Sequence, residues 1–130
     1  MEPIVIADTD VVIDFFSGAE PGASIITKLI PGDRLALTSV TIFELFAGIT
    51  GEKRLKQIRD LISAIPIFSL GRSEAEVGAR IYNELKKGGN LIGNQDILIA
   101  GICIAHDIAL FSKNKDHFSR ISHLRLFSSQ

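Results

Sequence analysis

The 130-residue sequence contains one cysteine and no tryptophan. A single cysteine excludes an intrachain disulfide and any zinc site built from several thiolates. Low cysteine content is typical of a reducing compartment, so we expect a cytoplasmic protein. No apolar run reaches the roughly 18 residues that a membrane span needs. The first residues, Met1-Glu2-Pro3, lack the basic start of a secretory signal. We therefore expect no membrane among its partners.

The sequence also lacks an excess of charge of either sign. It has 14 basic and 15 acidic residues, for a net charge of −1. A general electrostatic attraction to nucleic acid is therefore excluded, and any contact with RNA or DNA must come from a local basic patch. Hydrophobic residues make up 46% of the chain, which excludes intrinsic disorder. The length predicts one domain over residues 1–130.

Short apolar runs alternate with helical patterns along the chain, which is typical of an α/β fold. We expect strands at residues 4–7, 35–37, 109–112 and 124–127, with residues 66–68 as a strand or an extended linker. We expect helices at residues 11–16, 23–30, 42–49, 52–63, 72–87 and about 92–106. Together they predict a three-layer α/β/α domain with a short, mostly parallel central sheet of four or five strands.

Several polar residues fall where solvent exposure does not explain them. Asp8 follows a buried strand, and Asn114 and Asp116 follow another, at residues 109–112. Ligands bind beyond the carboxyl ends of parallel strands, which meet at one edge of the sheet. Asp96 begins a helix that is apolar on nearly all sides, which indicates burial. We expect Asp8, Asp96 and the residues after the later strand to converge.

Each of these positions also has a purely structural interpretation. Asp8 and Asp96 are acceptable turn or cap residues, and Asp10 is a more natural helix cap than a ligand. Thr41 and Glu44 have the spacing of a capping box, so Glu44 either caps a helix or binds a ligand.

The helix that Asp96 begins has a cap of its own available in Asn94. The segment around Asn114 and Asp116 is also a plausible polar turn. Only their common placement at one sheet edge favours a site.

Converging carboxylates repel one another unless a cation lies between them. Oxygen ligands without histidine or cysteine suit Mg²⁺ or Mn²⁺, which neutralise a phosphate and activate water. The pattern therefore indicates phosphoryl or phosphodiester chemistry. Its expected substrate-binding residues are Thr9, Ser112, Lys113, Asn114 and Lys115. The three histidines, His106, His117 and His123, have no zinc-site spacing, and we expect structural or surface roles for them.

Four blocks of the sequence resemble the PIN-domain ribonucleases, especially the VapC-type toxins. They are residues 4–13 (IVIADTDVVI), 41–49 (TIFELFAGI), 92–100 (IGNQDILIA) and 111–121 (FSKNKDHFSRI), followed by a closing segment at 124–126. The blocks occur in the family's order over essentially the whole chain. The resemblance implies an endoribonuclease dependent on Mg²⁺ or Mn²⁺, with Asp8, Glu44 and Asp96 as its acidic core. It also implies a homodimer that a cognate antitoxin silences.

The fourth block departs from the family pattern, which often has an acid where Asn114 stands. Asp116 carries a charge but lies two residues further along the turn. If a helical turn begins after Asn114, the Asp116 carboxylate can swing back toward Asp96. We predict that Asp116 completes the catalytic and metal-binding acids, through a water, while Asn114 orients it or the substrate phosphate.

Other families share part of the pattern. Asp8 and Asp10 after an apolar strand also resemble the nucleophile motif of haloacid-dehalogenase-type phosphatases. That family needs a later acidic pair after a strand, whereas Asp96 begins a helix. A phospho-receiver domain needs an acid at the end of a central strand, where Thr38 stands. A PIN ribonuclease that processes RNA outside a toxin pair is the remaining alternative.

Overall fold

The computed structural model describes residues 2–128 of the chain. Within them, four strands alternate with seven helices. The strands are β1 (Val5–Ala7), β2 (Leu35–Thr38), β3 (Ile67–Phe68) and β4 (Ala109–Phe111). The helices are α1 (Thr9–Ser17), α2 (Gly22–Leu29), α3 (Ser39–Gly48), α4 (Glu52–Ala64), α5 (Arg72–Lys87), α6 (Asn94–Ala105) and α7 (Lys115–Phe118).

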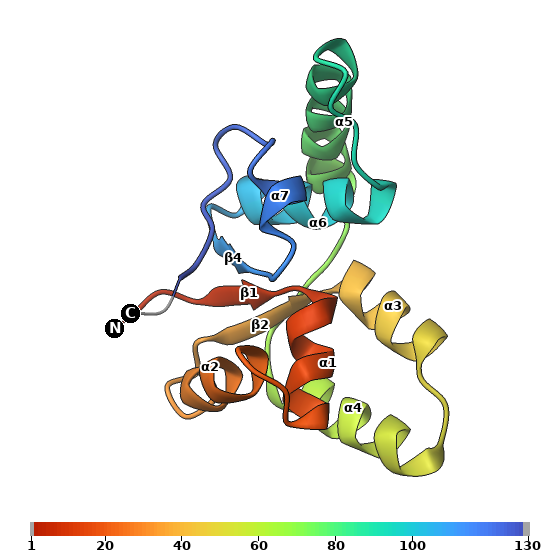
Figure 1. The fold of residues 1–130 in the computed structure, drawn as a ribbon, viewed down its shortest axis with the longest axis vertical. Coiled ribbons are helices and arrows are strands. Elements are labelled where there is room, and N and C mark those ends of the chain that lie inside the picture. The colour runs from red at the N-terminus through yellow and green to blue at the C-terminus, as the bar shows by residue number, and fades with distance from the viewer. Residues whose placement is uncertain (1, 129–130) are drawn as a thin grey trace.

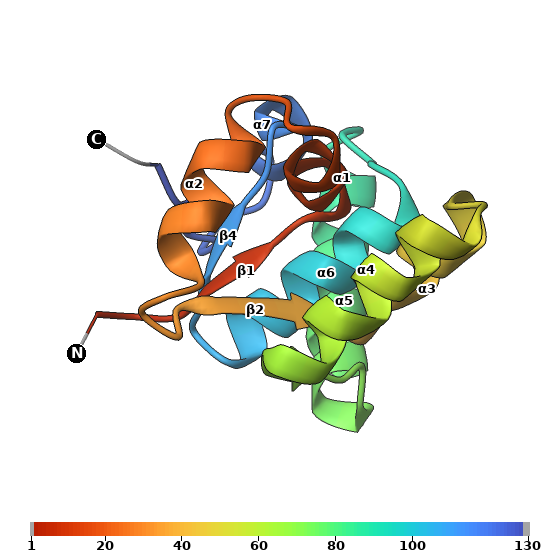
Figure 2. The same ribbon diagram turned by 90° about the horizontal axis from the view of Figure 1, so that it is seen from below.

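The strands form one parallel sheet in the order β3-β2-β1-β4. Figure 2 shows β4, β1 and β2 side by side. The chain adds β2 and β3 on one side of β1 and then returns to place β4 on the other. The strand order therefore reverses between β1 and β4. In open parallel sheets, this reversal opens a crevice at the carboxyl ends of the two strands, and ligands bind there.

Successive side chains along each strand enter different halves of the core, because a strand alternates its side chains between two faces. Ile6 and Leu110 belong to a buried cluster with residues of α5 and α6. Val5, Leu35 and Phe111 belong to a second cluster with residues of α1, α2 and α4. Figure 1 shows α5, α6 and α7 on one side of the sheet, with α1, α2 and α4 on the other. The predicted three-layer α/β/α fold is confirmed.

The first helix begins earlier than expected. Asp8, and not Asp10, is the N-cap of α1, because its Oδ1 accepts a hydrogen bond from the backbone N–H of Thr9 at 2.8 Å. Asp10 lies in the first turn of the helix. The prediction of Asp10 as the cap was wrong, and its carboxylate is thereby left for other contacts.

Two further caps that the sequence offered as alternatives are not formed. Thr38 caps α3, since its hydroxyl oxygen accepts from the backbone N–H of Thr41 at 3.1 Å. The Thr41–Glu44 capping box is therefore absent, and the Glu44 carboxylate does not serve this helix end. The N-cap of α6 is Gly93, which has no side chain to offer, so Asn94 is the first helical residue instead.

The predicted strand at residues 124–127 was wrong in extent. Leu126 forms a single parallel bridge with Leu110. Two hydrogen bonds frame it: the N–H of Leu110 donates to Arg125 O, and the N–H of Phe127 donates to Leu110 O, at 2.9 and 2.8 Å. The segment at residues 66–68 was interpreted as a strand or an extended linker, and residues 67–68 form a strand. No helix within residues 2–128 is both long and apolar enough to cross a membrane.

Helix α6 lies deep in the fold because it packs closely against α5. A Cβ atom at Gly101 of α6 would lie 3.0 Å from the backbone oxygen of Glu74 and 3.0 Å from the nitrogen of Gly78. Only glycine allows this approach without displacing α5. At the end of α6, His106 Nε2 lies 2.7 Å from Glu74 Oε2, so this histidine has the structural role expected for it. The contact holds α6, and with it Asp96, in a defined position.

Candidate active site

Asp8 lies where β1 ends and is only 6% exposed. Its Oδ1 accepts from the backbone N–H of Thr9, and its Oδ2 accepts from the hydroxyl of Ser112 at 2.7 Å. The backbone N–H of Asp8 donates to Phe111 O at 2.8 Å. Asp8 therefore bridges the carboxyl ends of β1 and β4, at the reversal point of the sheet.

The carboxyl group of Asp8 titrates far from its ordinary range. Burial raises its pKa from 3.8 to about 7, and the charges of Asp10 and Asp96 act in the same direction. The hydrogen bonds from Ser112 and Thr9 lower the pKa, but they offset only part of this rise. A cation bound beside Asp8 would favour the ionised form by the reverse of the same electrostatics.

Glu44 reaches the same place from the next strand along the sheet. It lies on α3, which begins directly after β2, and its carboxylate is half-buried. The hydroxyl of Thr9 donates to Glu44 Oε1 at 2.7 Å. Thr9 thus holds Asp8 through its backbone and Glu44 through its side chain. A threonine at the start of α1 links two acids that lie far apart in the sequence.

Asp96 lies in the first turn of α6 and contacts the segment that follows β4. Its Oδ2 lies 3.4 Å from Asn114 Nδ2 and 3.2 Å from His117 Nδ1. Asn114 Nδ2 and His117 Nδ1 lie 2.8 Å apart. We call Asp8, Glu44 and Asp96 the acidic group. The structure connects each of its members to Thr9 or to the residues after β4.

His117 is a site residue that sequence reasoning missed. Its expected role was structural or at the surface, yet its ring nitrogen lies beside Asp96. The available signal was its spacing from Asn114. Residues three apart share one face of a helix, so Asn114 and His117 flank a helical turn on the same side. A helical turn does begin after Asn114, as α7.

The turn after β4, formed by Ser112, Lys113 and Asn114, is held by two acids of α1. Asp10 Oδ2 accepts from the backbone N–H of Lys113 at 3.1 Å. The Lys113 ammonium lies 3.0 Å from either carboxylate oxygen of Asp14, which is 6% exposed. Lys113 was expected to contact phosphate, but its ammonium is paired with Asp14. The ion pair fixes the turn that carries Ser112 and Asn114.

The two remaining predicted site residues lie on the surface of α7. Lys115 and Asp116 are both exposed. The polar contact found for Asp116 within the described residues uses its backbone oxygen, which accepts from the Ser119 hydroxyl at 3.2 Å. The metal-binding role of Asp116 stays a prediction, and the observed contacts favour Asn114 as the nearer partner of Asp96.

Several features of these residues suit a hard divalent cation. The acidic group offers carboxylate oxygens, and Asp8 is buried with a raised pKa. Asp10 Oδ1 is buried and has no hydrogen-bond partner. Among residues 2–128, no three histidine, cysteine or acidic side chains are grouped closely enough to hold an ion as they stand. Thr9 joins Asp8 to Glu44 instead, so an ion would have to replace such contacts.

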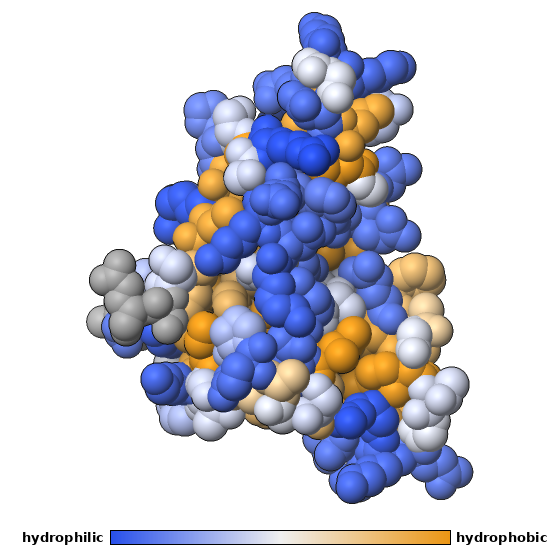
Figure 3. Space-filling view, viewed as in Figure 1, coloured by the Kyte–Doolittle hydropathy of each residue, from blue (hydrophilic) through white to orange (hydrophobic). Residues whose placement is uncertain are grey.

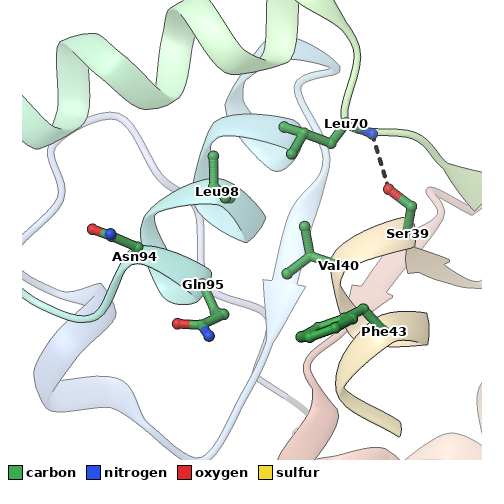
Figure 4. Close-up of a pocket in the computed structure, with 7 residues that line it drawn as sticks. All are labelled: Ser39, Val40, Phe43, Leu70, Asn94, Gln95 and Leu98. Atoms are coloured by element: carbon green, nitrogen blue, oxygen red, sulfur yellow. Dashed lines mark hydrogen bonds between the residues drawn. The ribbon is translucent and has the colours of Figure 1, made fainter. Parts of the chain in front are cut away.

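An apolar hollow of about 440 Å³ lies next to the acidic group, between α3 and α6 (Figure 4). It is lined by Ser39, Val40, Phe43, Leu70, Asn94, Gln95 and Leu98. The Ser39 hydroxyl oxygen accepts from the backbone N–H of Leu70 at 3.0 Å, which closes one end of the hollow. Phe43 is 63% exposed at its rim. The hollow therefore presents apolar surface one residue away from Asp96.

More apolar surface lies on the adjoining side of the molecule. Ile13 of α1 and Phe46 of α3 are 46% and 37% exposed. Figure 3 shows hydrophobic surface over α1 and α3, beside a hydrophilic band that runs over α7. Contiguous apolar surface of this kind is typical of protein–protein interfaces. The candidate site is thus bordered by surfaces suited to protein contacts.

The fold and the site define an α/β protein with a cluster of acids at the reversal point of its parallel sheet. Comparison with known sequences identifies the family. The PIN domain family matches residues 5–124. The match covers nearly the whole chain and includes the four blocks apart from Ile4. The chain belongs to the PIN-domain family.

Its relatives are VapC proteins. The chain is 28% identical over 125 residues to Ribonuclease VapC1 of Methanocaldococcus jannaschii, covering 96% of this chain and 86% of the relative. It is 31% identical over 96 residues to Ribonuclease VapC2 of Haemophilus influenzae, covering 71% and 73%. The solved structure of VapBC-1 from nontypeable Haemophilus influenzae superposes with a TM-score of 0.79 at 27% identity, covering 96% and 97%. These relatives confirm the resemblance to VapC toxins and do not support the haloacid-dehalogenase alternative.

The raised pKa of Asp8 predicts a specific pH dependence of stability. In the metal-free protein, protonated Asp8 stabilises the folded state relative to the unfolded state. This stabilisation is fully present below about pH 4 and is lost as the pH rises through about 7. Asp8→Asn removes this loss, because the amide cannot ionise. The variant should exceed the wild type in free energy of unfolding by a few kcal/mol at pH 8, since each tenfold change in a proton-binding equilibrium corresponds to about 1.4 kcal/mol.

The measurement is urea denaturation in EDTA at pH 4 and pH 8. The difference between Asp8→Asn and the wild type should be larger at pH 8. The exposed Asp116→Asn variant is the control, for which the two pH values should give similar differences. A constant difference for Asp8→Asn at both pH values would contradict the assignment.

Proposed function

We propose that this protein is a divalent-metal-dependent endoribonuclease built on a single PIN-like domain, and that it acts as the toxin of a toxin–antitoxin pair. The observation that carries the proposal is the buried Asp8 carboxylate at the reversal point of the sheet. Burial and the charges of Asp10 and Asp96 destabilise its ionised form. A bound cation would relieve that electrostatic cost. The names of the relatives, Ribonuclease VapC1 and VapC2, support the reaction class.

Asp8, Glu44 and Asp96 would hold Mg²⁺ or Mn²⁺ in this proposal. The ion would neutralise charge on the scissile phosphate and lower the pKa of the attacking water. A nearby carboxylate would accept the proton of that water. Glu44, half-buried and held by the Thr9 hydroxyl, is the one that we propose. As the family resemblance implies, the products would carry a 5′-phosphate and a 3′-hydroxyl.

The RNA backbone would lie across the residues that surround the acidic group. Thr9 and Ser112 present hydroxyls there, and Asn114 presents an amide. Lys115, exposed on α7, is the cation that we propose for phosphate contact. Lys113 contributes differently, because its pairing with Asp14 positions the turn that carries Ser112 and Asn114. The near-zero net charge makes such local contacts necessary.

Protein partners follow from the apolar surfaces beside the site. We infer a homodimer through the helices of residues 40–63 and 72–87, which are α3, α4 and α5. Phe43 of α3 is 63% exposed, and Leu70, just before α5, is 37% exposed. The similarity to VapBC-1 supports a second partner, a VapB-like antitoxin. An Arg or Lys side chain of such a partner could pair with the acidic group and displace the metal.

Metal dependence and the role of Asp96 are tested together. Wild-type protein should cleave total RNA in Mg²⁺ or Mn²⁺ and stop in EDTA. Asp96→Asn should lower cleavage at least about 100-fold, because the acidic group loses a charge that the ion needs. End-mapping of the products checks the predicted 5′-phosphate. His123→Asn, an exposed change, is the control and should cleave like the wild type. Full activity of Asp96→Asn, or in EDTA, would refute the metal mechanism.

Whether Asn114 or Asp116 joins the acidic group in binding the metal is tested by measuring metal affinity rather than cleavage. The sequence pattern favours Asp116, whereas the contacts with Asp96 favour Asn114. From these contacts, Asn114→Ala should weaken Mn²⁺ binding more than Asp116→Ala in calorimetric titrations. We expect about tenfold for Asn114→Ala, the lower end for residues that support metal ligands. A larger loss in Asp116→Ala would restore the sequence-based assignment.

The dimer interface is tested by a substitution that introduces one negative charge. Phe43→Glu should convert a dimer to a monomer, because a carboxylate would be buried in the apolar contact between subunits. Light scattering at micromolar concentration measures the change. Leu91→Glu is a matched control, since Leu91 is also exposed, at 43%, and lies between α5 and α6, outside the interface helices. A wild-type monomer, or an unchanged dimer in Phe43→Glu, would exclude this interface.

A further inference from the structure

Three polar atoms form a small triangle between α6 and α7. They are Oδ2 of Asp96, the amide nitrogen of Asn114 and Nδ1 of His117, and they lie 2.8, 3.2 and 3.4 Å apart. The side chains of His117 and Asp96 are 41% and 22% exposed, so solvent reaches the triangle. The triangle adjoins the acidic group through Asp96, and none of the roles proposed so far uses the imidazole.

The hydrogen bonds of this triangle depend on whether Nδ1 of His117 carries a proton. If the Asn114 amide nitrogen points inward, it donates to both neighbours. His117 Nδ1 is then an acceptor whose lone pair faces Asp96 Oδ2 at 3.2 Å. Rotating the Asn114 side-chain amide by half a turn exchanges its nitrogen and oxygen, which are of similar size. The amide oxygen then faces Asp96 Oδ2 at 3.4 Å. With Nδ1 unprotonated, either orientation leaves two acceptors facing each other, whereas an Nδ1–H group can donate to Asp96 Oδ2 and to a turned-over amide oxygen together. A metal ion in the place of that shared proton would meet the same three acceptors.

The spacing of the three atoms suits one metal ion. An octahedral ion with ligand bonds of about 2.1 Å places neighbouring ligand atoms about 3.0 Å apart. The three observed distances, 2.8 to 3.4 Å, lie around this value. With the amide oxygen inward, the carboxylate oxygen, amide oxygen and imidazole nitrogen are all acceptors and form one face of such an octahedron. The face thus combines two oxygen ligands with one nitrogen ligand.

The imidazole does not depend on metal for its position. Phe118, the next residue, is fully buried in the cluster that contains α6 residues. Shortly after the C-terminal end of α7, Ile121 is buried in the same cluster. Packing of the hydrophobic neighbours therefore fixes α7 against α6, with His117 at Asp96. A ligand held in place in this way loses little conformational freedom on binding.

We propose that His117 is a nitrogen ligand of the cation site, together with Asp96 and Asn114, and that it selects first-row transition ions over Mg²⁺. This inference rests on the proposed function, because it concerns ligands of the same site. Mg²⁺ takes oxygen ligands almost exclusively, whereas imidazole binds transition ions with an affinity that rises from Mn²⁺ toward Co²⁺ and Zn²⁺. A site with oxygen ligands alone would lack this preference.

The test compares ion affinities and looks for nitrogen coordination directly. Tag-free wild type, His117→Ala and His117→Asp are titrated calorimetrically with MgCl₂, MnCl₂ and CoCl₂, each ion alone. His123→Asn removes an exposed histidine elsewhere and serves as the matched control. Pulsed EPR of the Mn²⁺-loaded proteins records coupling to ¹⁴N, and thermal unfolding verifies that each variant is folded.

Wild type and His123→Asn should show imidazole ¹⁴N coupling, and both His117 variants should lack it. His117→Ala should lose about 10- to 100-fold in Co²⁺ affinity, a loss at least as large as that expected for residues supporting a ligand. Its Mg²⁺ affinity should fall much less. His117→Asp should bind Mg²⁺ at least as well as the wild type, because it supplies an oxygen ligand.

Absence of ¹⁴N coupling in the wild type, or its persistence in His117→Ala, would overturn the inference. So would equal ratios of Co²⁺ to Mg²⁺ affinity in the wild type and His117→Ala. If the wild type cleaves RNA and binds ions normally under those outcomes, the proposed function stands and only the role of His117 falls. If the wild type binds none of the three ions, metal dependence falls together with this inference.

Discussion

The hydroxyl of Ser112 donates to the buried carboxylate of Asp8, and most of the candidate site depends on this one hydrogen bond. It crosses the place where the strand order of the sheet reverses, so it joins the end of β1 to the end of β4. Asp8 also caps α1, which sets the direction of the helix that carries Asp10 and Asp14. A carboxylate that is buried, shared between two strands and near other acids has a raised pKa, and this electrostatic cost makes the site receptive to a cation.

The turn after β4 transmits this arrangement to the rest of the site. Asp10 and Asp14 hold Lys113 by its backbone and its ammonium, respectively. The turn then directs Asn114 and His117 toward Asp96 on α6. Lys113, which the sequence assigns to RNA binding, is thereby paired with Asp14 within the protein. Helix α6 reaches its place because the α5–α6 contact at Gly101 admits no side chain.

Catalysis and partner binding would use adjoining parts of one surface. The acidic group lies beside a hydrophilic band, and exposed apolar residues of α1 and α3 lie next to it. A partner that covers the apolar surface would therefore come close to the acids, which is a physical route to inhibition. His117 adds an element that oxygen-only sites lack, because imidazole distinguishes ions by chemical softness rather than by size alone.

Local patterns in the sequence predicted the fold class and pointed to Asp8 and Asp96, whereas Glu44 entered the acidic group through the family resemblance. Apolar runs followed by Asp8, and a buried helix opened by Asp96, are visible without coordinates because burial and strand ends leave a local signature. The α5 boundaries, residues 72–87, were predicted correctly for the same reason. Only the tertiary structure decided which polar atoms meet. Thr9 links to Glu44, Lys113 to Asp14, and His117 to Asp96 across 35, 99 and 21 residues of sequence. Such partners depend on how strands and helices pack, and no local periodicity encodes that choice.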